Sequence, residues 1–160
     1  MFSYTLGLRT EFAVAEVSRI VTDALGVEDL SRVHERHPGL FVSVRDSSDP
    51  IRQSIYSEFL GALSTASLYY SMNSRDKEQL WRAERVMAVS AARLAVETDA
   101  LAFMTFDLDS LIMRRTDGVL YLYGSFNAWR EPEVTSQIPQ PWVTTDNKHD
   151  GTPPGGVTYG

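Results

Sequence analysis

Residues 97–124, with the sequence ETDALAFMTFDLDSLIMRRTDGVLYLYG, decide the fold class of this chain. Three short apolar runs in this stretch are separated by Asp107-Leu108-Asp109 and by Asp117-Gly118. An Asp-Gly pair between two strand-like runs is a strong short-range signal for a β-hairpin with a tight turn. We therefore expect a three-stranded antiparallel meander, with strands at residues 100–106, 110–116 and 119–124.

The tight turn also predicts which side chains of the hairpin share a face. It places Arg114 opposite Tyr121 and Ile112 opposite Tyr123, and strand side chains alternate between faces. One face is expected to be core and carries Leu111, Met113, Leu120 and Leu122. The other face is rich in tyrosine and arginine, which are enriched in protein interfaces. The predicted partner-binding residues on this tyrosine-rich face are Ile112, Arg114, Tyr121 and Tyr123, joined by Tyr69 from an earlier strand.

Whether the tyrosine-rich face is open depends on what covers it. If the helices pack only on the core face, the tyrosine-rich face is partly exposed to solvent. The segment that follows the meander contains Phe126, Trp129 and Trp142. These large aromatic side chains could instead fold back over the tyrosine-rich face, and the sequence leaves both alternatives open.

The rest of the chain alternates between strand-like and helical patterns. Residues 2–9, FSYTLGLR, alternate strictly, as a half-buried strand does. Apolar residues then recur at helical spacing from Thr10, a plausible N-cap, to Gly26, which suits a helix end. Residues 51–63 fit either a strand or irregular structure. Two further strands and one long helix are predicted at residues 40–45, 66–72 and 76–97.

The order of these elements favours an α+β protein. We predict an antiparallel sheet of about five to seven strands, with two helices packed on one face and the three-stranded meander at its C-terminal end. Residues 1–130 are expected to form this single domain. Residues 131–160 contain five of the seven prolines and end in GTPPGGVTYG. They are therefore predicted to be a loop or a disordered tail.

Composition and charge narrow the classes of function. The chain has 160 residues, a net charge of −6 and no cysteine. The negative charge argues against nucleic-acid binding, which requires a basic surface, and is compatible with a basic protein partner. The absence of cysteine excludes disulfides and fits a reducing compartment, so we expect a cytoplasmic protein. No apolar run is long enough for a membrane span, and the N-terminus has no signal-peptide pattern.

Few groups are candidates for catalysis or metal binding. His34 and His37 precede Pro38 in a polar stretch, but a zinc site needs more ligands than two. Asp107 and Asp109 suit turn geometry better than acid–base catalysis, and they could form an acidic rim that meets a basic partner. The chain contains no nucleophile-elbow or phosphate-loop motif. We therefore predict no catalytic residue, no cofactor and no metal.

Several stretches resemble a known bacterial family. They are FSYTLGL at residues 2–8, the strand at 68–72 before a long helix, and ALAFMTFDLDSLIMRRTDGVLYLYG at 100–124. The pattern is similar to that of the swarming-inhibition (Sit-type) toxin immunity proteins and their actinobacterial relatives. The late hairpin of that family corresponds here to Asp99–Phe103 and Leu111–Leu122. The resemblance implies a non-catalytic protein that binds and silences a cognate toxin.

Three functions follow from these observations. The first is an immunity or antitoxin-like protein that occludes a toxin through the tyrosine-rich face and the acidic rim. The second is a small-ligand-binding protein or an enzyme with a pocket between sheet and helices, which would need several polar groups to converge there. The third is a structural subunit of a phage or secretion system that assembles through exposed strands.

Overall fold

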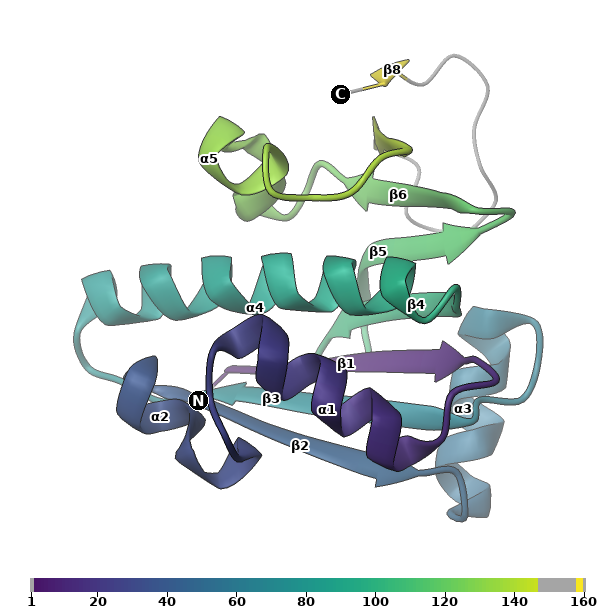
Figure 1. The fold of residues 1–160 in the computed structure, drawn as a ribbon. Coiled ribbons are helices and arrows are strands. Elements are labelled where there is room, and N and C mark those ends of the chain that lie inside the picture. Colours follow the sequence, from purple (N-terminus) through teal and green to yellow (C-terminus); the bar gives the residue numbers. More distant parts are fainter. Residues whose placement is uncertain (1, 147–157, 160) are drawn as a thin grey trace.

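A computed structural model describes residues 2–146 and 158–159 of the chain. Figure 1 shows a twisted sheet with helices on both sides of it. The strands are β1 (Phe2–Arg9), β2 (Leu40–Asp46), β3 (Ala66–Met72), β4 (Leu101–Phe106), β5 (Ser110–Thr116), β6 (Val119–Tyr123), β7 (Trp142–Thr145) and β8 (Thr158–Tyr159). The helices are α1 (Val14–Leu25), α2 (Val33–Arg36), α3 (Pro50–Leu60), α4 (Lys77–Glu97) and α5 (Pro132–Thr135), with 3-10 turns η1 (Leu30–Arg32) and η2 (Asn127–Arg130).

The strands form one mixed sheet in the order β2-β3-β1-β4-β5-β6-β7-β8. Neighbouring strands are antiparallel except β6 and β7, which run parallel. Seven strands precede the two-residue β8, which pairs with β7. The prediction of an α+β protein with a mainly antiparallel sheet is therefore confirmed.

The meander of β4, β5 and β6 is also confirmed, with the predicted register between its last two strands. Arg114 pairs with Tyr121, and Thr116 pairs with Val119. The two central residues of the turn have positive φ, as a type I′ turn requires, and the second of them is Gly118 with a φ of 77°. Glycine adopts this conformation without a steric penalty, so the strands reverse within two residues.

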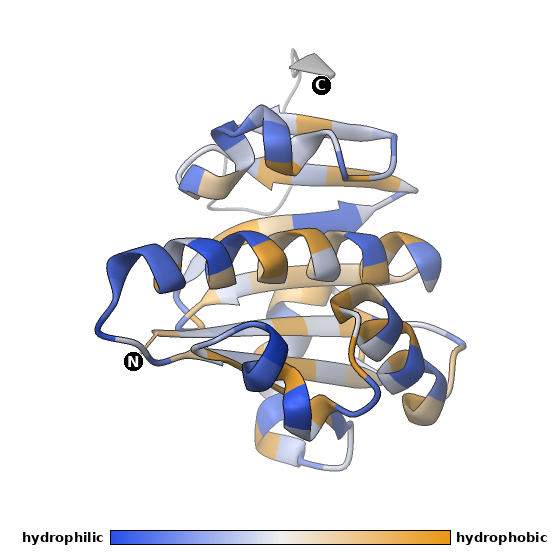
Figure 2. Cartoon of the chain, turned by 60° about the vertical axis from the view of Figure 1, so that its left-hand side comes forward, coloured by the Kyte–Doolittle hydropathy of each residue, from blue (hydrophilic) through white to orange (hydrophobic). Residues whose placement is uncertain are grey.

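The main core lies between the sheet and the helices α1 and α4 (Figure 1). Leu6 and Leu68 from the sheet are completely buried there, together with Val17 of α1 and Met87 of α4. Burying such side chains stabilises the fold by about 1.5–3 kcal/mol each. Figure 2 shows hydrophilic residues recurring along both helices, as expected for helices with one buried side.

The ends of these two helices are defined by local hydrogen bonds. α4 occupies nearly the predicted range, whereas α1 begins later than predicted, after Ala13, whose N–H donates to the Glu16 carboxylate. Thr10 does not cap α1, because the helix begins only at Val14; the Thr10 hydroxyl donates to the Thr98 carbonyl at 2.7 Å and accepts the Phe12 N–H. Gly26 ends α1 in the left-handed conformation, as predicted.

Helix α3 replaces the strand or irregular structure considered for residues 51–63. Its N-cap is Asp49, which accepts the Ile51 N–H, and Pro50 occupies the first turn. Gly61 ends the helix in the left-handed conformation. Helix α3 lies on the sheet face opposite α1 and α4 (Figure 1). The two predicted helices, α1 and α4, share one face of the sheet as predicted, and α3 adds an unpredicted helix on the other face.

A second apolar cluster lies under α3 and consists of Tyr56, Leu60, Phe103, Leu111 and Tyr123. The Phe103 ring is at its centre, stacked on Phe59 with 4.9 Å between ring centroids. This ring also lies across β1, because a Cβ added at Gly7 would be 2.1 Å from Phe103 Cε1. Gly7 is thus the residue that lets an aromatic ring lie flat on the sheet beneath α3.

A β-bulge changes the side-chain alternation at the start of β5. Met104 pairs with Met113, but the next residue of β4, Thr105, pairs with Leu111, so Ile112 is the extra residue. A bulge reorients the side chains next to it. Leu111 therefore belongs to the second apolar cluster, whereas Ile112 belongs to the main core. The predicted faces of Leu111 and Ile112 are reversed for this reason.

The C-terminal segment is structured as far as Asp146, so the prediction of a loop or a disordered tail from residue 131 is wrong for residues 131–146. The segment forms α5 and then β7, which joins the edge of the sheet beside β6. Trp129 Nε1 donates to the Ile112 carbonyl at 2.8 Å, and Trp142 is buried in the main core. The aromatic residues of this segment therefore pack beside α4 and not over the tyrosine-rich face. Residues 147–157 and 160 of the predicted tail lie outside the described residues.

Candidate partner-binding surface

The sheet face that carries α3 continues beyond this helix as a surface of hydroxyl and aromatic side chains. We call it the open sheet face, and it consists of Ser3, Phe41, Ser43, Arg45, Tyr69 and Ser71. These residues come from the neighbouring strands β1, β3 and β2. They alternate along each strand with residues of the main core, so they project to the opposite side.

Tyr69 lies at the middle of the open sheet face and is half-buried. The Arg45 guanidinium carbon is 5.4 Å from the centre of its ring, a cation–π contact. Phe41 is 45% exposed and stacks on His34 with 5.3 Å between ring centroids. The predicted face of Tyr69 is confirmed, and its contact with a partner stays a prediction.

The turn between β4 and β5 forms an acidic tip, which we define as Asp107, Leu108 and Asp109. All three residues are exposed. The Ser3 hydroxyl donates to Asp107 Oδ1 at 2.8 Å, and the Asp107 N–H donates to the Ser3 carbonyl at 3.0 Å. Because Ser3 belongs to the open sheet face, the acidic tip continues that surface at the N-terminal end of β1.

The remaining predicted site residues lie close to α3 or beneath the surface. Arg114 is half-buried, and its Nη1 donates to the Phe59 carbonyl at the end of α3. Tyr121 is half-buried against the second apolar cluster. Ile112 and Tyr123 are only 3% and 1% exposed, so their predicted place on an open face is wrong. The causes are the bulge at Ile112 and the cover that α3 gives to Tyr123.

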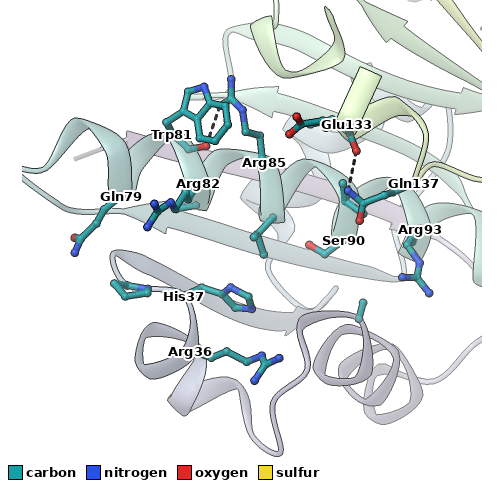
Figure 3. A pocket seen from close by; sticks show the side chains of 16 residues that line it. Arg36, His37, Gln79, Trp81, Arg82, Arg85, Ser90, Arg93, Glu133 and Gln137 are labelled. Carbon is teal, nitrogen blue, oxygen red and sulfur yellow. Dashed lines mark hydrogen bonds between the residues drawn. The ribbon is translucent and has the colours of Figure 1, made fainter. Parts of the chain in front are cut away.

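A hollow of about 540 Å³ lies on the outer side of α4, between α1–α2 and α5 (Figure 3). Arginine side chains dominate its polar lining, namely Arg36, Arg82, Arg85 and Arg93. Arg85 is fixed by an ion pair with Glu131 and by the Trp81 ring, whose centre is 3.6 Å from its guanidinium carbon. The hollow could hold an anion. It lies outside the helix layer, whereas the second predicted function places its pocket between sheet and helices.

A smaller hollow of about 430 Å³ adjoins the first, and Trp81 and Arg85 border both. Glu84 lines its interior and accepts a hydrogen bond from the Tyr4 hydroxyl at 3.3 Å. Burial raises the pKa of the Glu84 carboxyl, although the neighbouring Arg85 opposes this shift. Burial also raises the pKa of the Tyr4 phenol. These groups form an aromatic, partly desolvated hollow without a paired nucleophile and base.

His37 and Asp99 have structural partners. His37 Nε2 donates to the Leu25 carbonyl at the end of α1, at 2.8 Å. Asp99 pairs with Arg115, whose Nη2 lies 3.0 Å from its carboxylate. Among the residues that the structure describes, no three histidine or acidic side chains converge as a metal site. In the same part of the chain, no helix has the length and apolar character that crossing a membrane requires.

Strand alternation and turn chemistry predict some of these surface residues from the sequence, and others were not predicted. Tyr69 and the acidic residues of the tip follow from strand alternation and turn chemistry. Leu108 was not singled out, although a leucine between two turn aspartates is itself unusual. Trp81 and Arg85 lie one helical turn apart, a spacing that predicts their contact but not the hollows beside them.

Fold and surface together define a class of protein: an α+β protein with an acidic tip beside an open sheet face that carries Phe41, Arg45 and Tyr69, residue types enriched in protein interfaces. The chain belongs to the SitI3-like family, whose model matches residues 2–133. The predicted resemblance to Sit-type toxin immunity proteins is thereby confirmed.

Comparisons with other proteins add one solved structure. No curated protein matches the chain. The chain is similar to a chain of the CdiA-CT/CdiI toxin and immunity complex from Burkholderia pseudomallei. The two are 12% identical, with a TM-score of 0.48, and the match covers 68% of this chain and 93% of that chain.

Proposed function

We propose that this chain is a cytoplasmic immunity protein that binds a cognate protein toxin and blocks it by occlusion, without catalysis of its own. The observation that carries the proposal is membership of the SitI3-like family, an immunity-protein family, over residues 2–133. The net charge of −6 and the acidic tip suit a basic toxin, because complementary charge accelerates and orients association.

The proposed toxin-binding surface combines the open sheet face with the acidic tip. Tyr69 and Phe41 supply aromatic anchors, which carry much of the binding energy in protein interfaces. Asp107 and Asp109 supply long-range attraction at one edge. Arg114, Tyr121 and Tyr123 lie beneath and beside α3, and Arg114 and Tyr121 are proposed as secondary contacts, whereas Ile112 packs in the main core on the other face of the sheet.

The test is co-expression of this chain with the toxin encoded by the neighbouring gene, in a host that the toxin alone kills. The proposal predicts restored growth and a complex that co-elutes in gel filtration. Tyr69→Ala should weaken toxin binding by about tenfold or more, at an unchanged melting temperature. Arg19→Ala, on the exposed side of α1, is the matched control and should bind as wild type. A host that dies in the presence of well-folded chain, with no complex formed, would overturn the proposal.

The arginine-lined hollow on α4 favours a second candidate function, the binding of a small anion. Arg36 on α2 and Arg82 and Arg93 on α4 contribute cationic side chains to one cavity (Figure 3). Calorimetric titration with inorganic phosphate tests it. Saturable binding that is lost in Arg36→Glu would support this candidate, whereas no measurable heat of binding would remove it.

A further inference from the structure

The two turns of the meander both contain two successive residues with positive φ, but they differ in residue type. Asp117 and Gly118 have φ values of 52° and 77°, and Asp107 and Leu108 have values of 57° and 58°. The Asp117-Gly118 turn has glycine at its second central position, where the left-handed conformation is free of strain. The Asp107-Leu108 turn has Leu108 at the equivalent position, where a Cβ clashes with the backbone.

Leu108 receives little compensation from the fold for this conformation. It is 39% exposed and belongs neither to the main core nor to the second apolar cluster. Glycine or asparagine would satisfy the turn better. A strained, exposed apolar residue that packing does not require is a candidate for a functional contact.

The turn presents Leu108 in a fixed position. The Asp109 N–H donates to the Phe106 carbonyl at 3.0 Å, which closes the turn. Two hydrogen bonds between Asp107 and Ser3 attach the turn to the first residues of β1. A side chain that is already ordered before binding loses less entropy when a partner immobilises it.

We propose that Leu108 is an anchor that inserts into an apolar pocket on the toxin, and that basic residues around this pocket meet Asp107 and Asp109. This inference rests on the proposed function, because the toxin is the partner. Two observations carry it. Leu108 is exposed although its backbone has a strained positive φ. The carboxylates of Asp107 and Asp109, on both sides of it, are exposed at the same tip. The chemistry of the tip thus specifies an apolar pocket with a basic border.

The test is a reciprocal exchange between the two turns, with affinity and melting temperature measured for each variant. The probe is a catalytically inactive form of the toxin encoded by the neighbouring gene. Leu108→Gly should melt at the wild-type temperature or above it and bind the toxin at least about tenfold more weakly. Gly118→Leu, the matched control, should melt at a lower temperature and bind with wild-type affinity. Leu108→Met keeps an apolar side chain and should retain binding within about threefold.

Each other outcome overturns a defined part of the account. If wild type binds the toxin and Leu108→Gly binds equally well, the anchor is wrong and the proposed function stands. If Leu108→Gly melts well below wild type, Leu108 stabilises the fold and the strain argument is wrong. If wild-type chain does not bind the toxin at all, the proposed function fails, and the anchor fails with it.

Discussion

The Asp117-Gly118 turn and the Asp107-Leu108 turn terminate opposite ends of β5, and they differ in how well sequence and backbone agree. At the first turn, aspartate and glycine are the residues that the left-handed backbone favours. At the second, leucine occupies a conformation that glycine would adopt more easily. The first turn defines the register of β5 and β6, whereas the second turn presents a side chain at the surface.

This difference shows where to look for function in a protein of this class. A sequence specifies its fold most clearly where local preference and global structure coincide. Gly118 is an example, and it led directly to the register of the meander. Leu108 breaks the local rule without joining a core, and it does so on the surface that continues from Ser3. Such an exception points to selection for contact instead of stability.

The largest expected effect concerns the strand that supports the far side of the Asp117-Gly118 hairpin. Deleting residues 132–160 removes β7, which pairs with β6, and the buried side chains of Val134, Ile138 and Trp142. The free energy of unfolding should fall by more than about 3 kcal/mol. Urea denaturation measures it, with Trp142→Ala as the point variant. An unchanged unfolding midpoint in both proteins would show that the meander does not depend on β7.

The second prediction is the stability cost of leucine at the regular turn. Gly118→Leu should destabilise the fold by about 1–2 kcal/mol, because a left-handed conformation penalises a Cβ. The cost is conformational, since a Cβ at Gly118 would meet no described atom within 4 Å. Equilibrium denaturation provides the value. A variant as stable as wild type would remove the distinction between the two turns.

The third prediction is the converse gain at the strained turn. Leu108→Gly should stabilise the fold by about 0.5–1 kcal/mol, because relief of strain exceeds the added flexibility of the unfolded chain. The two turns lie at opposite ends of β5, so the double variant with Gly118→Leu should show additive changes within about 0.5 kcal/mol. Strong non-additivity would mean that the turns are coupled through β5.

The smallest expected effect is a difference between Asp107 and Asp117 in the rate of association with the toxin. Asp107→Asn should slow association with the toxin by about two- to threefold at low salt and less at physiological salt, since exposed charges act mainly on the association rate. Asp117→Asn, at the other turn, should associate like wild type. Stopped-flow measurements at two salt concentrations distinguish these variants. Equal slowing by both would indicate a general effect of net charge.

The parts of the fold that the sequence predicts are those with strong local signals. The Asp117-Gly118 turn, the strict alternation of residues 2–9 and the amphipathic stretch at 76–97 each correspond to an observed element. Helix α3 was missed because its apolar stripe is short: Ile55, Tyr56, Phe59 and Leu60 pack on the second apolar cluster, whereas Ile51 in the first turn is 73% exposed. Asp49 before Pro50 is a signal for the start of a helix, but the residues before it, Asp46-Ser47-Ser48, favour a loop, and the helix start was not recognised.

Other differences arise from tertiary structure that a single sequence does not specify. Leu111 and Ile112 are both apolar, so composition could not reveal which of them the bulge turns toward the main core. β7 has only four residues in a proline-rich segment, and its parallel partner lies earlier in the chain. For the candidate site, alternation placed Tyr69 correctly, whereas the unpredicted α3 covers Tyr123.

Hydrogen–deuterium exchange of the chain, alone and in complex with the toxin, tests the central claim most directly. Peptides that span residues 104–110 and 67–72 report on the acidic tip and on the open sheet face around Tyr69. A peptide that spans residues 115–121 reports on the Asp117-Gly118 turn. The account predicts that toxin binding slows exchange in the first two peptides and leaves the third unchanged. Slower exchange at residues 115–121, with no change at 104–110, would contradict it.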